Sequence, residues 1–305
     1  MKRPVIDHIY DPKYFKQLSV KFDHREGVLW LHMKPQGRGC FTHGLLKELK
    51  RYQQGLLKWK GNYPDGDALH PVKYEVLTSD LDGVFNYGGD LEFFIQAIAE
   101  NDRESLLHYG LACIDVVYPN AVNYNLPICT ISLICGDALG GGLEAALSGS
   151  TVIAESGVQM GFPEILFGLF PGMGAYSLLV RRVAPSVAKR ILTSGKVYTA
   201  EDFYELGIID HLTERGSGIE GVQSFIAKHR KHHSGYCAID KVIQAENPIS
   251  YDEMYKVVEI WVDTALSLTS KELRIMERLA RAQSQKDKNS GKPTMHDADE
   301  AMSVS

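Results

Sequence analysis

A glutamate placed beside a run of glycines is the first feature of this chain that could do chemistry. Glu144 ends the segment ICGDALGGGLE (residues 134–144), where an apolar, strand-like run gives way to a helix. Glycines at such a junction let a ligand approach the backbone, and the free N–H groups of a first helical turn favour negative charge. Gly141 lies about one helical turn before Glu144, so we expect both on one face. The simpler alternative is a carboxylate that complements the helix dipole.

A second glutamate stands in an almost entirely apolar segment. Glu164 lies within GFPEILFGLFPGMG (residues 161–174) and is the only charged residue between Glu155 and Arg181. Burial raises the pKa of a carboxyl group, which suits a general acid or base working near neutral pH. The structural alternative is a glutamate that follows a proline at a helix start.

A third segment, GVFNYGGDL (residues 83–91), joins a strand to a helix. The Gly89 amide there could act with the Gly141 amide as a pair of donors to one oxygen. Two preorganised backbone donors stabilise the enolate or the tetrahedral intermediate of a thioester. The alternative interpretation is an ordinary tight turn in which Asp90 caps the helix.

The elements that must position these segments follow an alternating pattern from Lys73 onward. Alternation of strands and helices predicts an α/β fold, with a parallel sheet covered by helices. The expected strands are 74–78, 127–135, 151–154 and 206–212. The expected helices are 91–99, 101–118 (begun by a capping box of Asn101 and Glu104), 174–183 and 185–193.

The two ends of the chain have different patterns. We expect a β-hairpin from 18–22 and 28–33, a helix over 42–58, and a loop over 61–71 that is rich in Gly, Pro and Asp. The last part reads as helices over 219–230, 238–244, 251–268 and 271–284. These patterns divide the chain into a core (1–215), a helical C-terminal segment that covers the site (216–284), and a polar tail expected to be disordered (285–305).

Composition excludes several classes of protein. The 305 residues carry 33 Lys and Arg against 38 Asp and Glu, so no basic balance of the nucleic-acid-binding kind exists. No apolar run is long enough to cross a bilayer, and the N-terminus lacks a secretory signal, so we expect a cytoplasmic protein. The five cysteines form no CxxC pair, so neither a disulfide framework nor a structural zinc site is expected. Cys113, Cys129 and Cys135 lie in apolar runs and are predicted to be core residues.

Together the three glycine-containing segments resemble those of the enoyl-CoA hydratase (crotonase) superfamily. The resemblance runs from about Val28 to Leu212. It implies a ββα spiral core, Gly89 and Gly141 as oxyanion-hole amides, and Glu144 and Glu164 as the paired acid and base. Two glutamates, rather than one, point to hydration or dehydration of a 2,3-bond. The same resemblance implies a homo-oligomer, a trimer or a hexamer, by analogy alone.

A narrower resemblance concerns YEVLTSD (residues 74–80), GVFN (83–86) and GGDL (88–91). These segments are similar to the diffusible signal factor synthases, which make cis-2-unsaturated fatty acids used as quorum-sensing signals. The resemblance implies dehydration of a 3-hydroxyacyl chain on acyl carrier protein and hydrolysis of the enoyl thioester. Glu164 would abstract the α-proton and Glu144 would protonate the leaving hydroxyl, although the two roles could be exchanged.

Two other functions stay open on the sequence alone. One is an enoyl-CoA hydratase of fatty-acid metabolism that uses the same two carboxylates on CoA thioesters. The other belongs to a different class: a regulatory protein with a vestigial site that binds a partner such as a signalling receptor.

The acyl chain needs an apolar pocket, for which Met173 and Trp261 are the candidates, while Gly88, Leu139 and Gly140 are expected beside the thioester. Two basic segments, 47–60 with five basic residues against one acidic and 271–288 with six against three, could attract an acidic carrier protein. The alternative interpretation is a pair of solvated helix faces.

No cofactor or metal is expected. A GxSxG elbow and a GxGxxG fingerprint are both missing, which argues against a serine hydrolase and against a nicotinamide or flavin cofactor. The DxDG segment at residues 80–83 lacks the remaining ligands of a calcium loop. The histidines of residues 228–233 are interpreted as a solvated helix end.

Overall fold

Two sheets form the centre of the molecule, and the computed structural model describes residues 14–35 and 37–286. The larger has six strands in the order β1-β2-β5-β7-β9-β12, parallel except for β1. Its strands are β1 (Leu18–Asp23), β2 (Val28–Met33), β5 (Tyr74–Ser79), β7 (Cys129–Ile134), β9 (Thr151–Glu155) and β12 (His211–Thr213). The second sheet has the order β11-β10-β8-β6, with strands β6 (Val84–Asn86), β8 (Asp137–Leu139), β10 (Gln159–Gly161) and β11 (Val197–Thr199).

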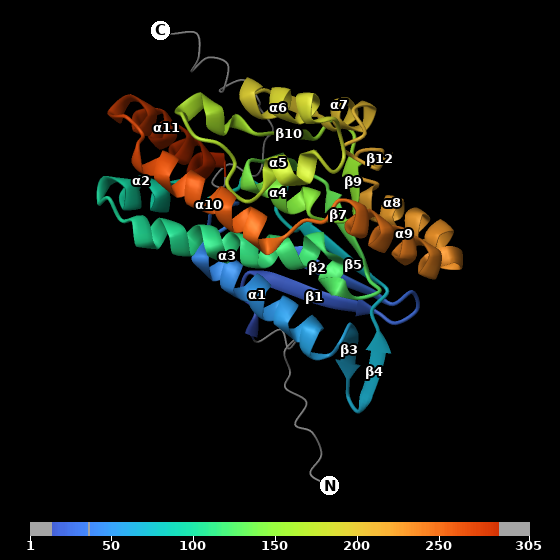
Figure 1. Cartoon of the computed structure of the whole chain (residues 1–305). Helices are drawn as coiled ribbons and strands as arrows, with labels where there is room; N and C mark the ends of the chain where they lie inside the picture. Colours follow the sequence, from blue (N-terminus) through green and yellow to red (C-terminus); the bar gives the residue numbers. More distant parts are fainter. Residues whose placement is uncertain (1–13, 36, 287–305) are drawn as a thin grey trace.

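The chain repeats one unit that links these sheets. Strands β5, β7 and β9 each lie in the large sheet, and each is followed at once by a strand of the small sheet: β6, β8 and β10. Helical segments then return the chain to the large sheet (Figure 1). These segments are α2 (Leu91–Ala99), α3 (Arg103–Ala121), η2 (Asn123–Asn125), α4 (Gly141–Leu147), η3 (Pro163–Phe167), α5 (Ala175–Leu179), α6 (Pro185–Ser194) and α7 (Ala200–Glu205). This repeat confirms the predicted α/β class and ββα spiral.

Helices bury both faces of the large sheet, as its long apolar strands require. On one face α1 (His43–Lys58), begun by the Thr42 cap, packs with α3. On the other face α8 (Gly218–His229) places Val222 and Ile226 against Val76 and Ile131.

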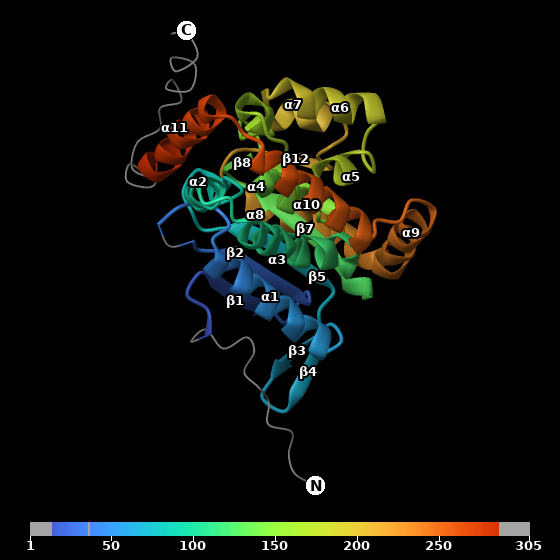
Figure 2. The ribbon, with the colours of Figure 1, turned by 60° about the vertical axis from the view of Figure 1, so that its left-hand side comes forward.

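The C-terminal part is helical, as predicted. After α8 come η4 (Arg230–His232), α9 (His233–Glu246), α10 (Tyr251–Leu266) and α11 (Ser270–Lys286). Helix α10 runs along α3, and α11 lies against α2 and η3 (Figure 2). The helices of the described residues are all too short or too polar to cross a membrane. The tail expected to be disordered lies outside the described residues from position 287 on.

Three predicted elements were wrong. Residues 61–71 hold a two-stranded hairpin, β3 (Asn62–Asp65) and β4 (Ala68–Pro71), whose turn-like composition hid its pairing. Asn101 turns the chain at φ 51° just beyond the end of α2, so the cap of α3 is Asp102, whose side chain accepts the Ser105 N–H at 3.0 Å. The strand expected over 206–212 starts only at β12, because the Ile208 and Ile209 amides bond back to the end of α7.

Two side-chain predictions also need correction. Cys135 is exposed, since it follows the last residue of β7, whereas Cys113 and Cys129 are buried as expected. His229 is not solvated: η4 folds α9 back on α8, and His229 stacks on Tyr236 and contacts the Tyr74 hydroxyl at 3.1 Å. Burial lowers the pKa of His229 to about 4.

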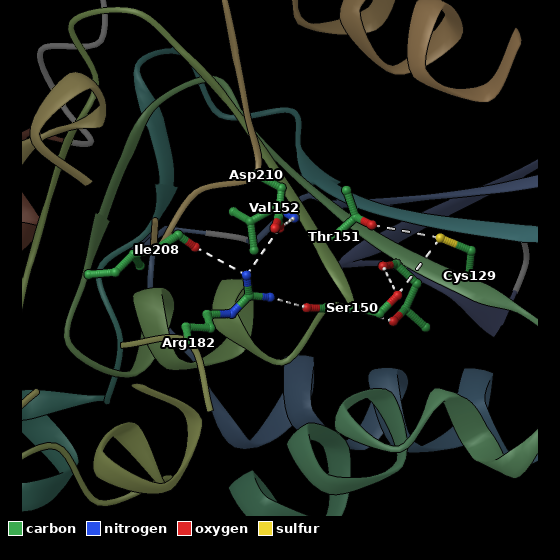
Figure 3. A network of polar contacts seen from close by, with 9 residues as sticks. Cys129, Ser150, Thr151, Val152, Arg182, Ile208 and Asp210 are labelled. Carbon is green, nitrogen blue, oxygen red and sulfur yellow. Dashed lines mark hydrogen bonds and ion pairs between the residues drawn. The ribbon is translucent and has the colours of Figure 1, made fainter. Parts of the chain in front are cut away.

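An arginine holds together the edge of the large sheet (Figure 3). The Arg182 guanidinium, only 13% exposed, donates to the Gly149 carbonyl at 2.7 Å and to the Ile208 carbonyl at 3.1 Å. It also pairs at 3.0 Å with Asp210, whose other contact is the Val152 N–H at 2.7 Å. The start of β9 and the approach to β12 are thereby fixed together, and β9 leads directly into the β10 strand of the small sheet.

One carboxyl group outside the candidate active site is also buried in the core. Glu75, on β5, is 3% exposed and accepts a hydrogen bond from the Tyr124 hydroxyl at 3.0 Å. It lines a cavity of about 30 Å³ together with Gln53, Asn120 and Ser148. Burial raises its pKa to about 7, against the opposing effects of the Tyr124 and Tyr52 hydroxyls.

Glu75→Gln is therefore expected to stabilise the fold in a pH-dependent way. The native pKa of about 7 exceeds the ordinary value, so the wild type loses stability as pH rises toward 7. The variant should unfold with a free energy roughly 1–3 kcal/mol higher at about pH 8, and with little difference at about pH 4. Urea denaturation at both pH values measures this. Glu214→Gln, at an exposed position, is the control and should show no such difference.

Candidate active site

Three adjacent parallel strands bring the candidate residues to one edge of the small sheet. Strands β6, β8 and β10 are neighbours, and they end at Asn86, Leu139 and Gly161. The carboxyl ends of parallel strands meet at the same edge, which is where α/β proteins bind ligands. The three segments that contain Gly89, Gly141 and Glu164 therefore meet there, although up to 75 residues separate them in the sequence.

The two glycine turns touch through their backbones. A Cβ on Gly88 would lie 2.6 Å from the Gly141 nitrogen, and Gly88 has a φ of +88°, so only glycine fits. The buried Asn86 holds this turn, because its Oδ1 accepts the Gly88 N–H at 2.7 Å. Within the part of the chain that the structure describes, neither the Gly89 nor the Gly141 amide donates a hydrogen bond. Both amides can therefore donate to an oxygen of a bound molecule.

A tyrosine hydroxyl from α3 fixes the first of these turns. Tyr109 is 2% exposed; its hydroxyl accepts the Asp90 N–H at 3.0 Å and donates to the Phe41 carbonyl. Phe41 in turn donates its N–H to the Gly88 carbonyl at 2.7 Å. Asp90 also caps α2 by accepting the Phe93 N–H at 3.2 Å. The hydroxyl thus bridges the backbone on both sides of Gly89 and holds its amide in place.

Glu144 lies in the first turn of α4 and is 1% exposed. Its Oε1 accepts two backbone hydrogen bonds at 2.7 Å, from Met173 and from Ala175. Burial raises its pKa well above the ordinary range and the nearby Glu164 raises it further, while the two amides oppose these effects. The protonated form of Glu144 is therefore favoured relative to that of an exposed glutamate.

Glu164 is the second residue of η3, directly after Pro163, as the structural alternative also expected. Its carboxyl lies against the Cα of Gly140, which has a φ of +53° and leaves no room for a Cβ. The Oε2 atom is buried and has no hydrogen-bond partner among the described residues. Burial raises the pKa of Glu164 to about 8. A buried carboxyl oxygen without a partner is available to a substrate or to water.

Apolar side chains line the approach to the two amides. A Cβ on Gly89 would lie 2.5 Å from the Phe94 ring, and one on Gly141 would lie 2.6 Å from Met173 Sδ. The Trp261 ring packs on the backbone of the residue before Met173 and meets Phe94 edge-on, with centroids 4.9 Å apart. These rings and the thioether form an apolar wall beside the polar groups.

The structure places all the predicted site residues at this edge. Each of them contacts another member of the set, either directly or through one intervening residue. They are Gly88, Gly89, Leu139, Gly140, Gly141, Glu144, Glu164, Met173 and Trp261. Sequence reasoning missed Asn86, Phe94, Tyr109 and the Ala175 amide. Asn86 lies inside the 83–91 segment and Ala175 directly follows the 161–174 segment, so both could have been considered, whereas Phe94 and Tyr109 look like ordinary apolar positions of a helix.

Sequence comparisons identify relatives of this arrangement. The family model described as enoyl-CoA hydratase/isomerase matches residues 67–228. A human mitochondrial methylglutaconyl-CoA hydratase is 29% identical over 189 residues, which are 60% of this chain and 53% of the relative. The mouse enzyme of that name is 27% identical over 187 residues, 60% of this chain and 57% of its own length. The chain thus matches a little over half the length of these relatives.

Solved structures share the fold. Human mitochondrial delta3-delta2-enoyl-CoA isomerase superposes with a TM-score of 0.72 at 18% identity, covering 88% of this chain and 99% of the isomerase. Pseudomonas aeruginosa DspI gives a TM-score of 0.61 at 22% identity, covering 81% of this chain and 96% of DspI. At these identities the likeness concerns the fold alone.

Tyr109→Phe tests whether the hydroxyl positions the Gly89 amide. The variant leaves the Asp90 N–H and the Phe41 carbonyl without their shared partner. We expect kcat for an acyl-thioester substrate to fall by about tenfold or more, with little change in KM, because an oxyanion donor acts chiefly in the transition state. Steady-state kinetics provides the measurement.

Tyr251→Phe is the matched control, since it removes another hydroxyl, one that donates to Asp115 at 2.8 Å away from the glycine turns. It should lower stability by about 1 kcal/mol and leave kcat unchanged. An equal loss of kcat in both variants would show that Tyr109 serves the fold alone.

Proposed function

Because the chain belongs to the enoyl-CoA hydratase/isomerase family, we propose that it is a dehydratase of 3-hydroxyacyl thioesters that also hydrolyses its enoyl product. The observation that carries the proposal is the pair of buried carboxyls, Glu144 and Glu164, beside two unbonded amides. The product would be a free cis-2-unsaturated medium-chain fatty acid, a quorum-sensing signal of the diffusible signal factor kind. The protein has no need of a cofactor in this reaction.

The dehydration step uses each group once. The Gly89 and Gly141 amides donate to the thioester carbonyl oxygen, which makes the α-proton more acidic. Ionised Glu164 takes that proton, and its unpartnered Oε2 supplies the acceptor. Glu144, which holds a proton, gives it to the 3-hydroxyl, so that the C–O bond breaks and water leaves as the 2,3-double bond forms.

The hydrolysis step reuses the same site. A water molecule loses a proton to a carboxylate and attacks the thioester carbon, and the two amides stabilise the tetrahedral intermediate. Collapse breaks the C–S bond, and the carrier thiol leaves with a proton while the acid is released. The sequence has no serine-hydrolase elbow, so a carboxylate acting through water is the route that these residues support.

Two alternative functions are weighed against this one. An enoyl-CoA hydratase of fatty-acid metabolism would use the same residues, and the curated relatives carry hydratase names. A regulatory protein with a vestigial site would have no reason to keep two carboxyls buried near each other at a cost to stability. The second alternative is therefore disfavoured, although catalysis is compatible with an additional receptor partner.

Incubation with 3-hydroxydodecanoyl-carrier protein tests the proposed reaction. Mass spectrometry should detect free cis-2-dodecenoic acid, whereas trans-2-enoyl thioester without free acid would support the plain hydratase instead.

Glu144→Gln and Glu164→Gln should each lower kcat by about 100-fold or more, since each removes an acid or base. Wild-type product formation by both variants would overturn the catalytic assignment. Because Glu164 must be ionised, kcat/KM should rise with pH up to about 8.

The carrier is the second part of the proposal, and α11 supplies the argument. Lys271, Arg274, Arg278 and Arg281 are exposed and lie at helical spacing on one side of α11, which packs against η3 beside the site. On α1, by contrast, Lys50 pairs with Asp115 at 2.6 Å and Arg51 covers the Tyr14 ring. We propose that the acidic carrier protein docks on the α11 side.

The double variant Arg274→Glu/Arg278→Glu should raise KM for the carrier-protein substrate by about tenfold and leave KM for the matching CoA thioester unchanged. Lys47→Glu/Lys58→Glu on α1 is the control of equal charge change. Steady-state kinetics with both substrates measures the effect, and an equal increase in the control would place the docking surface elsewhere.

A further inference from the structure

Three potential metal ligands gather at the end of the molecule where the β3–β4 hairpin projects (Figures 1 and 2). His24 begins the turn between β1 and β2, while Asp65 and His70 belong to the two strands of the hairpin. None of them belongs to the active-site edge of the small sheet. The cluster could not be expected from the sequence, because it depends on residues 62–71 forming a hairpin and not a loop.

The ligand atoms are already close to the spacing that an ion requires. One nitrogen of each histidine and one carboxylate oxygen all lie within 4.8 Å of one another, and His24 Nε2 is 3.6 Å from Asp65 Oδ2. Ligands on a tetrahedral zinc ion lie about 3.4 Å apart. A closure of at most about 1.4 Å, by two exposed side chains and the half-buried His70, therefore completes the site.

Aromatic packing holds the two imidazoles in this arrangement. Phe22 stacks on Tyr63 with centroids 4.6 Å apart and an interplanar angle of 14°. The His24 ring meets Phe22 edge-on at 4.9 Å and meets the His70 ring at 4.7 Å. Supporting contacts of this kind fix the orientation of metal-binding side chains.

We propose that His24, Asp65 and His70 bind a Zn²⁺ ion that joins the β1–β2 turn to the β3–β4 hairpin. Two imidazoles and one carboxylate suit a borderline-soft divalent cation, and water completes the fourth position. Hard cations such as Ca²⁺ prefer sets of oxygen ligands, so they should bind far more weakly.

Binding of the ion would stabilise the position of the hairpin against the β1–β2 turn. The hairpin is a separate two-stranded sheet of four-residue strands, and most of its residues are exposed or half-buried. A two-stranded hairpin is only marginally stable by itself. Just after β4, the Lys73 N–H donates to the Gly27 carbonyl of the β1–β2 turn at 2.8 Å, and at the hairpin itself the contacts described above are between rings. An ion held by both segments adds a stronger link to these ring contacts.

Titration of the tag-free full chain with ZnCl₂ by calorimetry tests the site. We expect one ion per chain in the wild type and an affinity at least about tenfold lower in His70→Ala and in Asp65→Asn. His108→Ala, at an exposed histidine of α3, is the matched control and should bind as the wild type does. Wild-type affinity in the double variant His24→Ala/His70→Ala, or equal binding of Ca²⁺, overturns the proposal.

Hydrogen exchange supplies a readout that does not depend on activity. Zn²⁺ should slow exchange at residues 62–71 in the wild type and have no effect there in His24→Ala/His70→Ala. Zinc-induced slowing of the same size in both proteins would contradict the role of these side chains in joining the hairpin.

Discussion

Two carboxyl groups buried close together are the constraint on which the active-site edge depends. Burial and mutual repulsion raise the pKa of Glu144, and burial raises that of Glu164. The surrounding backbone accommodates both groups: two amides donate to Glu144, and Gly140 leaves space for the Glu164 carboxyl. The burial that gives these two carboxyls their acid–base capacity is therefore also what makes the site costly to the stability of the fold.

Sequence reasoning placed residues correctly where their position is encoded locally. Gly89, Gly141 and the two glutamates each stand in a short segment at the end of a strand, so their meeting follows from parallel neighbours in one sheet. The alternation of strands and helices is equally local, whereas the ββα spiral was implied only by the resemblance to the crotonase superfamily, since the short strands β6, β8 and β10 were not predicted from the pattern. Glu164 was notable for the absence of any other charge around it in the sequence, and its burial is what raises its pKa.

Reasoning from sequence failed where contacts between distant segments decide the outcome. Tyr109 looks like a core residue of α3, and only its contacts with Asp90 and Phe41 reveal what its hydroxyl does. Strand β3 pairs only with β4, so residues 61–71 lack the apolar alternation of a strand packed on the core. His229 was misjudged because its burial depends on α9 turning back after η4.

Helix α10 supports the segment that donates to Glu144. The backbone at Gly172 packs on the Trp261 ring, and the backbone at Gly174 packs on the Met254 side chain. Both glycines that flank Met173 therefore contact α10. The hydrogen bonds from Met173 and Ala175 oppose the rise in the pKa of Glu144. A displacement of α10 that loosened these bonds would make Glu144 a weaker acid. Helix α10 therefore bears on the acidity of Glu144 through packing alone, by two side chains, Trp261 and Met254, that carry no ionisable group.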